Sequence, residues 1–403
     1  MAAPIPARTL PALPPQPADV PWPTDAWPRG DAAALGADAA RLDDLLDELV
    51  RPDLDPVLGR TSGAAVVAGG RLVAERYGVR PVQDVRALEP DPPVDQVDET
   101  TELLSWSMAK SITSLAVGIA AGDGHLRVDG PVGDPRWSTP DDPRAAITWD
   151  DLLAMRPGLR WTEEYYDLTG GLPDVVEMLY GAGQDDMAAF AARHPLVHPP
   201  GSPEAFTYSS GTTNIVVANL QRVLGLDADG MDRFLRQRLF DPIGMRSTRV
   251  AFDPAGTFVG SSFVHATLQD WCRFGLLALR GGTWDGRPVV PEGWIDQARR
   301  PRSWSNEVLH GAHWWTWDQD QMPFGAHGFE GQRVICFPTR DVVVVRLGWL
   351  ASDGAPALNA LITAMADCFP ERDLQRHPRP DADRPGRSAL PLAKGCQQPG
   401  RAS

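Results

Sequence analysis

Apolar positions follow a helical period through the middle of the chain and gather in short runs toward both ends. Two short apolar runs flank Gly69-Gly70, which predicts a β-hairpin over residues 63–78. Further strands are predicted over 311–317, 332–337 and 341–350. Helical spacing predicts helices over 32–50, 107–122, 149–155, 173–180, 187–193, 212–224, 232–239, 268–279 and 357–368.

The order of these elements predicts how the sheet is assembled. A hairpin comes first, helices fill the middle, and strands with a closing helix come last, so both ends of the chain contribute to one sheet. Residues 125–263 read as helices joined by Pro/Gly loops, which indicates an inserted helical subdomain. We therefore expect an α+β protein of the sandwich type, with a mostly antiparallel sheet flanked by helices.

The same pattern divides the chain into a main domain and two flanking segments. Residues 1–31 are rich in proline and carry Trp22 and Trp27, which is typical of an extended arm laid on a domain. The main domain is expected over 32–368. Residues 369–403 are polar and rich in Arg, Pro and Gly, and we expect them to be disordered.

Composition narrows the class of partner. A net charge of −15 and a pI near 4.9 argue against nucleic acid and anionic membranes. The N-terminus lacks a basic stretch followed by an apolar one, and no run reaches 18 apolar residues, so a cytoplasmic protein is expected. The four cysteines are far apart, which favours free thiols over a disulfide framework or a metal site.

Candidate chemistry begins at the helix predicted over 107–122. Ser107 and Lys110 are three positions apart, which places their side chains on one face of that helix. A serine hydroxyl becomes nucleophilic when a base removes its proton, and a lysine is such a base when burial keeps it neutral. The alternative is a helix-capping serine beside a solvated lysine. Only two lysines, Lys110 and Lys394, occur among 38 basic residues, and arginine cannot accept this proton, so the catalytic interpretation is favoured.

Two further stretches offer the groups that an acyl-transfer site needs. Tyr208 lies in a polar loop before a predicted helix, where it could pass a proton to a leaving group. Glycines cluster over 324–332 before a predicted strand, and their backbone N–H groups could stabilise an oxyanion. The loop over 161–167 contains acids and tyrosines and is either a surface loop or a substrate contact.

The stretches Ser-Met-Ala-Lys, Tyr-Ser-Ser and Ala-His-Gly-Phe-Glu-Gly-Gln, in this order, resemble the three signatures of the penicillin-recognising serine hydrolases. This superfamily includes class C β-lactamases, DD-peptidases and related esterases. Residues 147–155, the Glu-Glu-Tyr loop at 163–165 and His-Trp-Trp at 313–315 are most similar to the 6-aminohexanoate-dimer hydrolase branch. The resemblance extends over about residues 35–368.

The resemblance implies a role for each matching position. Ser107 is the expected nucleophile, Lys110 its general base, and Tyr208 the group that protonates the leaving amine or alcohol and later activates water. The backbone N–H groups of Ser107 and Phe329 are expected to form the oxyanion hole. Gly328, His327 and Tyr165 are expected near the substrate. The resemblance implies no metal and no cofactor.

Two departures from the family pattern bear on the substrate. Ser210 replaces the asparagine of Tyr-x-Asn, and Ala326-His327-Gly328 lacks the lysine of Lys-Thr-Gly. That lysine engages the substrate carboxylate in β-lactamases, so hydrolysis of a small amide or ester is favoured over β-lactam hydrolysis. The alternatives are a β-lactamase- or DD-peptidase-like activity, or a non-catalytic ligand-binding protein. The oligomeric state is left open, with a homodimer as one alternative.

Overall fold

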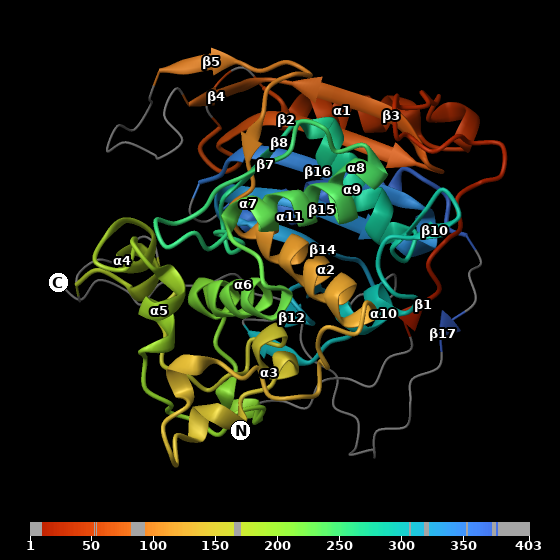
Figure 1. Ribbon diagram of the computed structural model, residues 1–403. Helices are drawn as coiled ribbons and strands as arrows, with labels where there is room; N and C mark the ends of the chain where they lie inside the picture. Colours follow the sequence, from red (N-terminus) through yellow and green to blue (C-terminus); the bar gives the residue numbers. More distant parts are fainter. Residues whose placement is uncertain are drawn as a thin grey trace, which may run out of the picture.

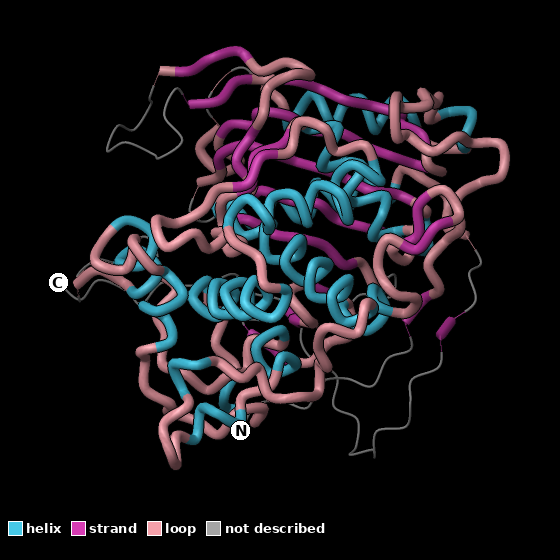
Figure 2. Tube along the Cα trace, in the orientation of Figure 1, coloured by secondary structure: helices cyan, strands magenta, loops and turns pink. Residues whose placement is uncertain are grey.

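The computed structural model describes residues 10–51, 53, 55–81, 93–164, 171–305, 308–317, 322–351, 354–372 and 376–377. At its centre is an eight-stranded antiparallel sheet of order β11-β12-β13-β14-β15-β16-β2-β3 (Figures 1 and 2). Its strands are β2 (Arg60–Ala68), β3 (Arg71–Tyr77), β11 (Ser303–Ser305), β12 (Val308–His310), β13 (Trp315–Thr316), β14 (Phe324–Gly328), β15 (Gln332–Phe337) and β16 (Val342–Trp349). Because β16 pairs with β2, the prediction that both chain ends build one sheet is confirmed.

The central strands are apolar on both faces because each face is covered by helices. Alternate residues enter two different cores, so Val67 and Val343 face one side while Val66 and Val344 face the other. Helices α2 (Ala109–Gly122) and α9 (Leu268–Leu279) contribute to the first core. Helices α1 (Ala39–Leu49) and α11 (Ala355–Asp367) contribute to the second. The architecture is therefore α+β, as predicted.

A second group of helices lies beside the sheet, at the lower left of Figure 1. It includes α3 (Trp149–Leu153), α4 (Asp174–Tyr180), α5 (Met187–Ala192) and α6 (Ser210–Leu224). Outside this group, the described part of the chain also contains α7 (Ala228–Leu235), α8 (Asp241–Ile243) and α10 (Trp294–Ala298). Within the described part of the chain, no helix is both long and apolar enough to cross a lipid bilayer.

Short strand pairs join the loops around this frame. They are β1 (Leu10–Pro11) with β17 (Arg376–His377), β4 (Val79–Pro81) with β5 (Val94–Gln96), β9 (Thr283–Trp284) with β10 (Arg287–Pro288), and β8 (Val264–Ala266) with both β6 (Leu103–Leu104) and β7 (Arg249–Val250). The pairing of β6 with β8 places the start of the predicted catalytic helix against residues about 160 positions later.

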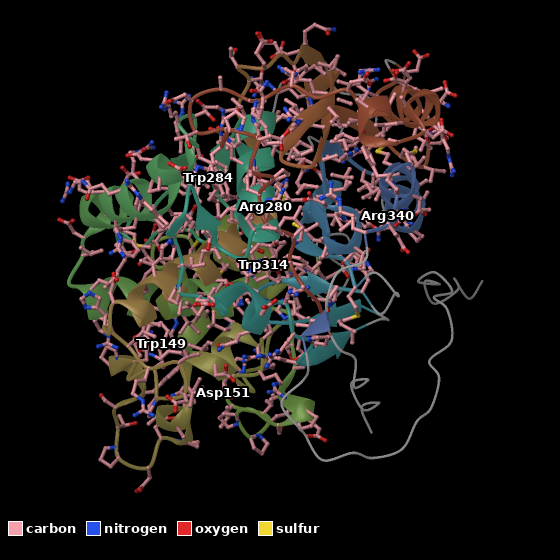
Figure 3. All side chains as sticks on the ribbon, turned by 90° about the vertical axis from the view of Figure 1, so that its right-hand side faces the viewer. Trp149, Asp151, Arg280, Trp284, Trp314 and Arg340 are labelled. Atoms are coloured by element: carbon pink, nitrogen blue, oxygen red, sulfur yellow. The ribbon has the colours of Figure 1, made fainter. Side chains whose placement is uncertain are left out.

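Buried arginines hold the proline-rich segment that precedes α1. Prolines lack an N–H group but keep their carbonyl oxygens, which need donors where the chain is buried. Three arginines donate to these oxygens: Arg273 Nε to Pro23 at 2.7 Å, Arg280 Nη1 to Pro14 at 3.0 Å and Arg299 Nη2 to Pro11 at 2.5 Å. Figure 3 shows Arg280 and Trp284 in the upper part of the molecule, above Trp149 and Asp151 of α3. Much of the tail predicted over 369–403 lies outside the described residues.

Three predicted elements differ from the structure. The helix expected over 32–50 begins only at Ala39, because Gly36 adopts a left-handed conformation and Asp38 caps α1. Only Trp315–Thr316 of the strand expected over 311–317 is a strand. Residues 324–328, expected as a glycine-rich approach to a strand, are themselves β14, and Gly325 allows close contact with the Val334 carbonyl.

Candidate active site

The predicted nucleophile and base meet at the start of α2. Ser107 lies in a 3₁₀ turn (η2, Trp106–Met108) that continues into α2, so the two side chains are one turn apart. Lys110 Nζ is 2.9 Å from Ser107 Oγ. The lysine is only 2% exposed and Ser107 is 9% exposed. The pair predicted from sequence spacing is therefore in direct hydrogen-bond contact within a buried environment.

The surroundings of Lys110 lower its pKa and so increase the fraction of neutral lysine. Its Nζ also contacts Ser210 Oγ at 2.8 Å and the carbonyl oxygen of Ser261 at 3.0 Å. Burial lowers the lysine pKa to about 8, and the Glu163 carboxylate partly opposes this effect. A lysine with such a pKa can accept a proton near neutral pH.

Backbone strain marks the residue before Ser107, the predicted nucleophile. Trp106 has φ = 47°, which is uncommon for a bulky side chain and costs conformational energy. Its ring packs edge-on against Phe329 at 5.5 Å between centroids and against Phe263 at 6.3 Å. These contacts hold the turn that presents Ser107.

Tyr208 reaches the same point from the loop before α6, whose first turn is capped by Ser209. The side chains of Ser107 and Trp315 act on the Tyr208 hydroxyl, and each slightly lowers its pKa. Lys110 Nζ lies 4.9 Å from the centre of the tyrosine ring. Burial, with a smaller contribution from Glu163, raises the pKa of Tyr208 well above its ordinary value. The phenol therefore stays protonated at neutral pH and is able to donate a proton.

Glu163 completes the cluster, although the sequence analysis did not select it. Its Oε1 accepts from Ser210 Oγ at 2.5 Å, and its Oε2 accepts from Ser210 N at 2.9 Å and from Trp161 Nε1 at 2.6 Å. The loop over 161–167 was recognised as acidic, but nothing in its local pattern indicated a contact 47 residues away. Tyr165, expected near the substrate, lies outside the described residues.

The end of β14 approaches the nucleophile turn from the other side. A Cβ atom on Gly328 would lie 2.3 Å from the carbonyl oxygen of Ser105, so only glycine permits this approach. Phe329 follows immediately and packs on Trp106. This geometry brings the backbone of Phe329 beside that of the turn containing Ser107, where the family resemblance implies an oxyanion hole.

The side chain of His327, on β14, contacts two tryptophan rings. Its ring stacks on Trp315 at 5.6 Å and lies 4.8 Å from Trp317, and Trp315 in turn packs on Tyr208 at 5.0 Å. Burial holds the pKa of His327 well below 6.5, with smaller contributions from Arg333 and His310. The histidine is therefore a neutral group that contacts the site through Trp315.

Two more buried histidines surround the site and were not predicted as part of it. His313 donates from Nδ1 to the Leu153 carbonyl at 2.8 Å, which leaves Nε2 to accept from Thr213 Oγ1 at 3.1 Å. Burial lowers the pKa of His313 to about 3. The pKa of His310 is also well below 6.5, mainly through burial. Both rings are neutral at pH 7.

Comparisons with known proteins relate the chain to a family. A family profile described as Beta-lactamase matches residues 14–357. The 6-aminohexanoate-dimer hydrolase of Paenarthrobacter ureafaciens is 25% identical over 348 residues, covering 81% of this chain and 82% of that protein.

Solved structures show the same fold. A Bacillus anthracis protein provisionally named a 6-aminohexanoate-dimer hydrolase superposes with a TM-score of 0.64 at 18% identity, covering 89% of this chain and 90% of that one. A penicillin-binding protein of Bacillus halodurans has a TM-score of 0.60 at 17% identity, covering 80% of this chain and 99% of that one. The chain thus has a β-lactamase-like fold, and with the family profile matching most of its length it belongs to the Beta-lactamase family of hydrolases.

Proposed function

We propose that this protein is a serine hydrolase that cleaves a small amide or ester through an acyl-enzyme intermediate. The observation that carries the proposal is the buried contact of 2.9 Å between Ser107 Oγ and Lys110 Nζ, with the Tyr208 ring 4.9 Å from the same Nζ. A purely ligand-binding protein would gain little from burying a lysine whose pKa falls to about 8.

The geometry supports the following sequence of steps. Lys110 accepts the Ser107 proton as Oγ attacks the substrate carbonyl carbon, and the backbone N–H groups of Ser107 and Phe329 stabilise the oxyanion. The bond to the leaving group breaks as Tyr208 donates its proton to that group. Water then attacks the acyl-enzyme and returns a proton to the Tyr208 oxygen, and Lys110 returns its proton to Ser107 Oγ as the acid is released. The net reaction consumes one water molecule.

The surroundings favour a linear amide or an ester over a β-lactam. The position that carries a lysine in the family motif is Ala326, which is buried and uncharged. The neighbouring His327 is neutral because burial keeps its pKa below 6.5. Neither residue supplies a cation for a substrate carboxylate. A simple carboxylic ester fits this proposal, as does a linear amide of the 6-aminohexanoate-oligomer type whose carboxylate lies away from Ala326 and His327.

The proposal is tested by the kinetics of p-nitrophenyl butyrate hydrolysis in a stopped-flow instrument. We expect a burst of p-nitrophenol that approaches one equivalent per active site, followed by slower turnover as the acyl-enzyme hydrolyses. A single-turnover measurement with excess enzyme separates acylation from deacylation. The absence of hydrolysis for p-nitrophenyl esters and for 6-aminohexanoate dimers would contradict the proposal.

The pH dependence should report the ionisation of Lys110. Because its pKa is about 8, only about one lysine in ten is neutral at pH 7, and kcat/KM should rise up to about pH 8. The buried histidines are already neutral in this range, and the raised pKa of Tyr208 removes any alkaline fall below about pH 10. A kcat/KM that stays constant from pH 6 to 9 would contradict Lys110 as the base.

Replacing Tyr208 with Phe should impair catalysis in a way that depends on the leaving group. The ring contacts remain, but the proton for the leaving group is lost, so we expect about a 100-fold decrease with an anilide or alkyl ester. A p-nitrophenyl ester should be affected much less, because nitrophenolate leaves without a proton. The measurement is kcat/KM on a matched ester and anilide. Equal losses on both would show that Tyr208 does not protonate the leaving group.

A further inference from the structure

Hydrogen bonds around Lys110 have a direction that follows from the chemistry of its partners. Three oxygen atoms surround Nζ: Ser107 Oγ at 2.9 Å, Ser210 Oγ at 2.8 Å and the Ser261 carbonyl at 3.0 Å. A carbonyl oxygen only accepts, so one N–H of the lysine is directed at Ser261. The two hydroxyls can in principle donate or accept, and their direction depends on their other partners.

Glu163 fixes the direction in which the Ser210 hydroxyl donates its hydrogen bond. The carboxylate lies at the N-terminus of α6, where the helix dipole favours a negative charge. It receives the Ser210 backbone N–H and the Trp161 indole N–H at Oε2, and both groups can only donate. Its Oε1 lies 2.5 Å from Ser210 Oγ, so the single hydroxyl hydrogen of Ser210 is directed at the carboxylate. Towards Lys110, Ser210 Oγ can therefore only accept.

A neutral amine has two N–H bonds and one lone pair. In this site the two N–H bonds are directed at Ser210 Oγ and the Ser261 carbonyl, which leaves the lone pair facing Ser107 Oγ. We propose that Glu163 is a positioning residue that fixes the direction of donation along the chain Glu163–Ser210–Lys110–Ser107, so that the lysine lone pair receives the Ser107 proton. This inference rests on the proposed function, because it assigns how the base of that reaction is oriented.

The carboxylate also acts on the ionisation of the lysine. Among the described residues, the titratable groups that act on Lys110 or face it are Glu163 from the loop before α4, Tyr208 from the loop before α6, His310 at the end of β12 and His313 after it. The two histidines are neutral and the tyrosine is protonated, so Glu163 supplies the negative charge that raises the Lys110 pKa against burial. Loss of this charge should make the lysine lose its proton at lower pH.

The variant Glu163→Gln separates orientation from charge. The amide oxygen of Gln is expected to accept from the Ser210 backbone N–H and the Trp161 indole N–H. The amide NH₂ is then directed at Ser210 Oγ. Ser210 would then donate its hydrogen to the Lys110 lone pair and compete with Ser107. We expect the single-turnover acylation rate with p-nitrophenyl butyrate to fall about 10- to 100-fold, and the acid limb of its pH profile to move to lower pH.

Two further variants complete the experiment. Glu164→Gln removes a charge from the adjacent, exposed position of the same loop and should leave both the rate and the acid limb unchanged. Ser210→Ala removes the hydroxyl that links Glu163 to Lys110 and should lower the acylation rate to a similar extent as Glu163→Gln. Thermal denaturation of each variant shows whether it is folded at the assay temperature.

The outcomes distinguish this inference from the function on which it rests. If the wild-type protein forms no acyl-enzyme, the proposed function is wrong. If the wild type is acylated and Glu163→Gln reacts within about twofold of its rate, Glu163 does not orient the base. A slower Glu163→Gln whose acid limb is unmoved, or moves to higher pH, would also overturn the inference, because it would indicate only a disturbed loop.

Discussion

Replacing Ser107 with Ala should reduce hydrolysis by at least about 10⁴-fold. The change removes the hydroxyl oxygen that we propose forms the acyl bond, 2.9 Å from Lys110 Nζ. Lys110 keeps its contacts with Ser210 and Ser261, so the loss of one hydrogen bond should cost only about 1 kcal/mol of stability. The measurement is kcat/KM on an ester substrate, with thermal denaturation as the check on folding.

A matched control is available two residues before the nucleophile. Ser105 is fully buried, and its hydroxyl donates to the backbone carbonyls of Trp106 and Ser262 rather than to Lys110. The variant Ser105→Ala should therefore lose stability but keep most of its activity per folded molecule. If Ser107→Ala retained more than a few per cent of the wild-type activity, the nucleophile would have to be another residue.

Replacing Lys110 with Arg should be nearly as damaging, with a decrease of about 10²- to 10⁴-fold. Arginine keeps a positive charge at any pH used in assays, so it cannot accept the Ser107 proton. The same variant should lose the rise in rate towards pH 8, because that rise reports the lysine ionisation. The decisive measurement is the pH profile of single-turnover acylation, compared with that of the wild type.

Lys110→Met provides the control for charge and size. Methionine has a similar length, carries no charge and suits a buried position, so this variant should fold while lacking the base. Both variants should therefore be inactive, whether or not the positive charge remains. An active Lys110→Arg protein with an unchanged pH profile would show that a different group removes the proton.

Local sequence patterns predicted the elements whose formation depends on their own residues. Strand β15 and helix α9 match their predicted ranges, because an apolar run and a capped periodic segment are both local signals. Strand β14 was missed because its glycines weaken the local pattern. It is a strand because its backbone is paired with β15 on one side and β13 on the other.

The same distinction explains which parts of the site were predicted. Ser107 and Lys110 share one helical turn, so their spacing alone indicated their contact. Tyr208 lies about 100 positions away and was assigned through the order of three motifs in a known family. Glu163 contacts Ser210 on another segment, and the Glu-Glu-Tyr loop that contains it does not by itself indicate this pairing. Its role could be inferred only from the hydrogen-bond directions in the folded structure.

The central claim is that Ser107 forms a covalent acyl bond. The most direct test is intact-protein mass spectrometry after brief exposure to p-nitrophenyl butyrate and, separately, to a fluorophosphonate, followed by peptide mapping. We expect one butyryl or phosphonyl group per chain, located on Ser107 and absent in Ser107→Ala. No adduct with either reagent, or an adduct located on another residue, would contradict the account.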